Sequence, residues 1–155
     1  MTGPPAVAID LDGVLGDTRP LWDDWLASAS TLLGLDPARL PEDRGEAATL
    51  LDRDAGNWRA LLERFAEERV AVYLRRDPAT GDALRALAGS GRVLGVFTDA
   101  PEPLARAVLN HLGAERLTTE LVAGAGALER LQAALGADST VVRSHRELLD
   151  LGRRV

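Results

Sequence analysis

The sequence predicts an α/β protein with a three-layer, Rossmann-like parallel sheet and a small helical segment inserted after the first strand. Two observations lead to this fold class. From residue 82 onward, short apolar strands alternate with amphipathic helices. Such alternation produces parallel sheets with helices on both faces. An all-helical stretch, residues 19–81, separates the first predicted strand from this regular part.

The N-terminal half contains one predicted strand and two predicted helices. Residues 6–10 ("AVAID") form a short apolar run typical of a buried strand. Apolar side chains repeat at helical spacing over residues 19–34, and Gly34 is a suitable end for that helix. Two prolines and a glycine within residues 35–53 predict a loop with room for one short helix. A second amphipathic helix is expected over residues 57–69, and residues 70–81 are compatible with either a strand or a helix.

The C-terminal half is regular. Its expected elements are a helix (82–89), a strand (92–98), a helix (99–113), a strand (119–124), a helix (127–136), a strand (139–143) and a final helix (145–154). We therefore divide the chain into a core, residues 1–18 and 82–155, and a cap, residues 19–81. In open α/β sheets the ligand site lies at the carboxyl ends of the strands. The cap is expected to cover that edge.

Composition narrows the classes of function. The formal net charge of −6 argues against nucleic acid as a partner. The chain has no cysteine and two histidines, which leaves no thiolate or histidine metal site. No apolar run reaches the length of a membrane span and the N-terminus lacks the pattern of a signal peptide, so we expect a cytoplasmic protein without a membrane partner. The oligomeric state stays open.

The stretch "AIDLDGVLGDT" places two carboxylates where the first strand ends. Side chains alternate along a strand, so Asp10 and Asp12 point to the same side. Gly13 allows the backbone to turn away tightly. A surface turn or a calcium loop are alternative interpretations, but the EF-hand pattern fails because Val14 stands where an acid or amide is required.

"DLDGVLGDT" resembles the first motif of the haloacid dehalogenase (HAD) superfamily, D-x-D-G-x-x-x-D-[ST], which follows a hydrophobic strand. "VLGVFTDA" is similar to the second motif of that superfamily, with Thr98 at the hydroxyl position. The resemblance covers nearly the whole chain in the same order. It implies a HAD-like fold and a phosphatase that acts on a small phosphorylated molecule.

The resemblance also implies a role for each matching residue. Asp10 would attack phosphorus and form an aspartyl phosphate. Asp12 would protonate the leaving oxygen and later activate water. The implied phosphate contacts are Thr98, Gly13 and Asp99, and the implied Mg²⁺ ligands are Asp10, Asp12 and Glu147.

Two later motifs depart from the superfamily pattern. The chain contains no lysine, and Arg130 is the nearest cation to the position where the third motif has one. In "VVRSHREL", aligned with the fourth motif, Arg143 replaces the main metal carboxylate. An arginine there is expected to pair with the carboxylates, lower their pKa values and occupy the space that Mg²⁺ needs.

Two functions remain open at this stage. The first is a HAD-like phosphatase with impaired or atypical metal use. The second is a catalytically inactive HAD-like domain that binds a phosphorylated ligand or another protein. A dehalogenase is less well supported, because a second acid at position 12 suits phosphoryl transfer better.

Overall fold

The computed structural model describes residues 3–155 and contains a four-stranded sheet in which all neighbouring strands are parallel. The strand order is β3-β2-β1-β4. In this order the strands are Glu120–Ala123, Leu94–Thr98, Val7–Asp10 and Thr140–Val142. Asp10 pairs with Phe97, and Ile9 pairs with Val142. The predicted parallel α/β sheet is thus confirmed, and Asp10 stands at the carboxyl end of an interior strand.

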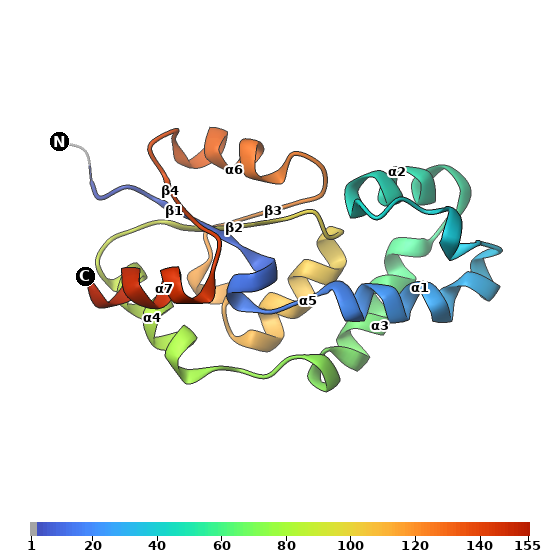
Figure 1. Ribbon diagram of the computed structural model, residues 1–155, viewed down its shortest axis with the longest axis horizontal. Coiled ribbons are helices and arrows are strands. Elements are labelled where there is room, and N and C mark those ends of the chain that lie inside the picture. The colour runs from blue at the N-terminus through green and yellow to red at the C-terminus, as the bar shows by residue number, and fades with distance from the viewer. Residues whose placement is uncertain (1–2) are drawn as a thin grey trace.

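Helices cover both faces of the sheet (Figure 1). Helix α6 (Ala127–Leu135) lies on one face, where its Leu131 packs against Ala8 and Phe97. On the other face lie α4 (Pro78–Gly89), α5 (Glu102–Leu112) and α7 (His145–Arg153). The three layers agree with the predicted architecture. No helix within residues 3–155 combines the length and the apolar character that crossing a membrane requires.

Three α-helices and a short 3₁₀ turn lie between residue 18 and α4; we call them the helical insertion. They are α1 (Arg19–Leu33), η2 (Pro37–Arg39), α2 (Arg44–Asp54) and α3 (Trp58–Tyr73). Figure 1 shows α1 and α2 on the side toward which the strands run. Trp25 packs between Trp22 and Trp58, with ring centroids 5.3 and 5.9 Å apart, and all three are buried. These tryptophans belong to the same buried apolar cluster as Ile9 of β1 and Leu104 of α5, so the insertion packs onto the core.

Local structure differs from expectation in two places. Residues 44–54 form a regular helix, α2, where we expected mainly loop. The carboxylate of Asp43 caps it by accepting a hydrogen bond from the Glu46 N–H at 2.9 Å. The ambiguous segment is helical at both ends, because α3 continues to Tyr73 and α4 already begins at Pro78, where proline suits a first helical turn. The division of the chain into core and cap stays a prediction.

Candidate active site

A tight turn after β1 positions the aspartate pair. Residues Leu11–Leu15 form a short helical turn that is interrupted at Gly13, whose φ is +91°. A side chain is strained at such an angle, so glycine is the residue that this turn requires. The Gly13 N–H donates to the Gly16 carbonyl at 3.0 Å and brings the chain back beside Asp12. Thr18 is thereby placed next to the Asp12 carboxylate.

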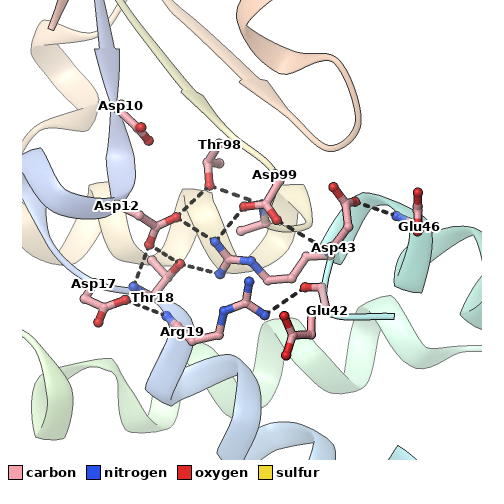
Figure 2. A network of polar contacts seen from close by, with 12 residues as sticks. Asp10, Asp12, Asp17, Thr18, Arg19, Glu42, Asp43, Glu46, Thr98 and Asp99 are labelled. Atoms are coloured by element: carbon pink, nitrogen blue, oxygen red, sulfur yellow. Dashed lines mark hydrogen bonds and ion pairs between the residues drawn. The ribbon is translucent and has the colours of Figure 1, made fainter. Parts of the chain in front are cut away.

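Asp12 accepts four hydrogen bonds, and both of its oxygens are used (Figure 2). Its Oδ1 accepts from the backbone N–H and the hydroxyl of Thr18, at 2.7 and 2.6 Å. Its Oδ2 accepts from the Thr98 hydroxyl at 3.1 Å and from Nη2 of Arg44 at 2.6 Å. Thr98, at the end of β2, therefore meets Asp12 directly, as the carboxyl ends of adjacent parallel strands should.

Arg44 is the residue of the site that the sequence analysis did not find. It stands in the first turn of α2, yet its side chain is only 2% exposed. Nη2 bridges Asp12 and Asp99, at 2.6 and 2.8 Å, and Nη1 donates to the Thr18 hydroxyl at 2.6 Å. The Arg44 backbone N–H donates to the other Asp99 oxygen at 3.2 Å. This guanidinium thus joins the helical insertion to the ends of both β1 and β2.

The pKa values of Arg44 and Asp99 reflect this contact. Burial by itself lowers the pKa of Arg44, but its hydrogen bonds and its proximity to Asp99 and Asp12 outweigh burial and raise it above the ordinary value. Burial raises the pKa of Asp99, but the hydrogen bonds and charge of Arg44 more than compensate and lower it. Both groups are therefore charged at neutral pH.

One signal in the sequence could have revealed Arg44. A positive charge in the first turn of a helix opposes the helix dipole, and in Arg44 carboxylates from elsewhere in the chain compensate for this. The next residue, Gly45, fits closely against the core. A Cβ at position 45 would lie 2.8 Å from the backbone nitrogen of Ala125, in the loop after β3. Arg130 donates to the carbonyls of Ala123 and Ala125 in that loop, and so lies outside the carboxylate cluster.

The Asp10 carboxyl is partly buried, and its side chain is 24% exposed. Burial, together with the nearby charge of Asp12, raises the pKa of Asp10 to about 6. The charge of Arg143 opposes this rise but is too weak to reverse it. The expectation that Arg143 would bring the Asp10 pKa below its ordinary value is wrong, because desolvation and like-charge repulsion together exceed the attraction of a largely exposed guanidinium.

Arg143 and Glu147 lie at the junction of β4 and α7. Arg143 is 58% exposed, with Nη1 at 3.8 Å from Oδ2 of Asp10 and its guanidinium 5.6 Å from the centre of the Phe97 ring. The Glu147 carboxylate faces the start of its own helix. It accepts from the Ser144 hydroxyl at 3.2 Å and from the Arg143 N–H at 3.4 Å, while Ser144 caps the helix. These contacts give Glu147 a helix-capping position.

The residues at the site do not fit Mg²⁺ in this conformation. Mg²⁺ requires nearly octahedral oxygen coordination and usually takes one or two carboxylates together with water. Hydrogen-bond donors occupy both oxygens of Asp12, Glu147 caps α7, and a guanidinium stands near Asp10. Over residues 3–155, no group of three or more His, Cys, Asp and Glu side chains is arranged to hold a metal ion.

No family model and no curated protein matches the chain, but several solved structures do. A protein assigned as a beta-phosphoglucomutase from Thermotoga maritima is 21% identical, with a TM-score of 0.53 over 97% of this chain and 82% of that one. CbbY from Rhodobacter sphaeroides, solved in complex with phosphate, is 16% identical, with a TM-score of 0.62 over 92% and 82%. A HAD phosphatase from Thermococcus onnurineus is 18% identical, with a TM-score of 0.50 over 96% and 97%.

The parallel sheet, with an aspartate pair at the end of an interior strand and helices inserted directly after it, defines a doubly wound α/β protein with its candidate site at the carboxyl edge. The structural matches make the class more specific. The chain has the HAD-like fold, as the resemblance of its first motif implied.

Proposed function

We propose that the protein is a HAD-like phosphatase that hydrolyses a small phosphorylated metabolite through an aspartyl phosphate on Asp10. The observation that supports this most is the position of Asp10. Its carboxyl stands at the carboxyl end of an interior strand, beside the Asp12–Thr98 pair, and its pKa of about 6 leaves it ionised at neutral pH. The solved structures that share the fold include proteins described as a HAD phosphatase and a beta-phosphoglucomutase.

The proposed reaction has two steps. In the first, an oxygen of Asp10 bonds to phosphorus, the ester P–O bond breaks, and Asp12 gives its proton to the leaving oxygen. In the second, water attacks the phosphorus and gives a proton to Asp12, and the P–O bond to Asp10 breaks to release phosphate. The Thr98 hydroxyl would bind a phosphoryl oxygen when it is not donating to Asp12.

The geometry adds a condition to the first step. Asp12 can carry a proton only when one of its oxygens is free of a donor, and both are occupied here. The contacts that can open are the two on Oδ2, because the insertion supplies Arg44 and the Thr98 hydroxyl can turn to a phosphoryl oxygen. The proposed turnover therefore includes release of Asp12 Oδ2 by both Arg44 and Thr98.

A second candidate function is a catalytically inactive domain that binds a phosphorylated ligand. The hydrogen bond from Arg44 to Asp12 favours this candidate, since an Asp12 held permanently by Arg44 could neither give nor take a proton. The poor fit of the site to Mg²⁺ favours it as well.

A phosphate-release screen separates the two candidates. Purified protein is incubated with a panel of small phosphomonoesters, with Mg²⁺ and with EDTA. Wild type is expected to release phosphate from at least one of them, and Asp10→Asn should lower the rate at least about 1,000-fold because the nucleophile is lost. Asp138→Asn, a change at an exposed aspartate, is the matched control. No release at high protein concentration under both conditions would leave the binding domain as the better conclusion.

A further inference from the structure

The candidate site contains three carboxylates and two guanidinium groups. Asp10, Asp12 and Asp99 supply the negative charges, and Arg44 and Arg143 offset two of the three. An oxyanion that approaches three unpaired carboxylates would be repelled strongly, since like charges repel one another far more in a partly buried site than in bulk water. Positive charge from some source is needed at this site: Arg143 lies 3.8 Å from Asp10, Arg44 pairs with Asp12 and Asp99, and the charge of Arg19 also acts on Asp99.

Arg143 is placed to meet a ligand directly. It is 58% exposed, and its 3.8 Å separation from Asp10 is too long for a hydrogen bond, so its N–H donors are available on the Asp10 side. Its backbone is fixed by the cap of α7, and the Phe97 ring lies beside the guanidinium. The planar fork of a guanidinium matches two oxygens of a phosphate group.

Arg44 can keep its charge in the site while it releases Asp12. Asp99 binds both its Nη2 and its backbone N–H, and the Thr18 hydroxyl binds its Nη1. These contacts hold the guanidinium when its bond to Oδ2 of Asp12 opens. In addition, the buried Nε of Arg44 has no acceptor within residues 3–155, so one donor is still unused.

We propose that Arg143 and Arg44 together replace the divalent cation of this site, so that it binds a phosphate-like oxyanion without metal. Arg143 contacts the oxyanion. Arg44 is a positioning residue that acts through Asp12 and Asp99, and it contributes only while the insertion is docked on the core. This inference rests on the proposed function in one respect, since it places the oxyanion beside Asp10.

The test measures binding of inorganic phosphate and of orthovanadate by titration calorimetry, in EDTA and in millimolar Mg²⁺. Wild type should bind both probes with the same affinity in the two buffers. Arg143→Gln and Arg44→Gln should each weaken binding by about tenfold or more, the loss expected when a charged hydrogen bond is removed. Arg53→Gln on α2 and Arg153→Gln on α7 replace exposed arginines that pair with Asp54 and Asp150, outside the candidate site. Neither change should alter the affinity for phosphate or vanadate.

Arg44→Lys and Arg143→Gln guard against loss of fold. Arg44→Lys keeps the charge and should recover part of the affinity lost in Arg44→Gln, which a purely structural defect would not predict. Arg143 is exposed, so Arg143→Gln should fold and still tests the two-arginine site where an Arg44 variant does not fold. Arg143→Asp should gain a Mg²⁺-dependent rise in Tm that wild type lacks.

Three results would overturn the inference: phosphate binding that requires Mg²⁺, binding that survives in Arg143→Gln, or no binding of either probe. These results are distinct from failure of the proposed function. A protein that binds phosphate in EDTA but hydrolyses no ester supports the two-arginine site and refutes the phosphatase. A protein that hydrolyses esters only with Mg²⁺ supports the phosphatase and refutes the two-arginine site.

Discussion

The N-terminus of α2 and the junction between β4 and α7 each bring one arginine to the same group of carboxylates, but they hold it very differently. Arg44 is 2% exposed and donates to three core side chains. Arg143 is 58% exposed and comes no nearer than 3.8 Å to Asp10. Burial and the number of partners thus separate a charge that joins two parts of the chain from one that is free to meet a ligand.

Loss of Arg44 should have the largest effect on stability. Arg44→Ala leaves Asp12 and Asp99 without their shared cation in a partly buried site, and removing one partner of a buried ion pair costs about 3–5 kcal/mol. Urea unfolding should show this loss in the free energy of unfolding. Arg53→Ala, on the exposed side of the same helix, should leave that free energy unchanged within error. Equal effects of the two changes would mean that Arg44 does not join the insertion to the core.

Gly45 tests the same docking without altering any charge. A Cβ at this position would lie 2.8 Å from the Ala125 backbone nitrogen, so either α2 or the loop after β3 has to move. Gly45→Ala should therefore cost about 1–3 kcal/mol, the usual range for overpacking. Gly89→Ala in α4 is the control, because nothing lies within 4 Å of its added Cβ. A neutral Gly45→Ala would show that α2 is docked loosely.

The sequence predicted the parts of the site that follow strands, and missed the part that the insertion supplies. Asp10, Asp12 and Thr98 could be placed together because parallel strands bring their carboxyl ends to one edge. Arg44 lies 32 residues from Asp12 along the chain, and its contact depends on how α2 docks. No periodicity in residues 35–53 encodes that docking. The three-residue spacing of Ser144 and Glu147 predicts a helix-capping role for Glu147. We assigned Glu147 as a metal ligand instead, because it aligns with a metal-ligand position of the fourth motif.

Substitution of Asp10 should have the next largest effect on the free energy of unfolding, and this effect should depend on pH. Its pKa is raised from 3.8 to about 6, so folding favours the protonated form. The resulting stabilisation is complete below pH 3.8 and is lost as pH rises through about 6. Asp10→Asn removes this loss and should be more stable than wild type at pH 7, by about 1–2 kcal/mol once solvent screening of the side chain is allowed for. The gain should disappear near pH 4. If the stability gain of Asp10→Asn persisted near pH 4, its cause would be something other than ionisation of Asp10.

The smallest effect on stability should come from Arg143. An exposed pair at 3.8 Å contributes little in water, so Arg143→Ala should change the free energy of unfolding by less than about 1 kcal/mol. Its electrostatic effect should still be visible, because the charge of Arg143 lowers the pKa of Asp10 and its removal should raise that pKa further above 6. Carbon-13 NMR titration of the Asp10 carboxyl measures the shift, and Arg153→Ala, which leaves the site charge intact, should not produce it. A large loss of stability in Arg143→Ala, or an unchanged Asp10 titration, would mean that the two arginines are held more alike than their exposure indicates. A small loss with a shifted titration is the behaviour of a cation that is held in place by its backbone and available to a ligand.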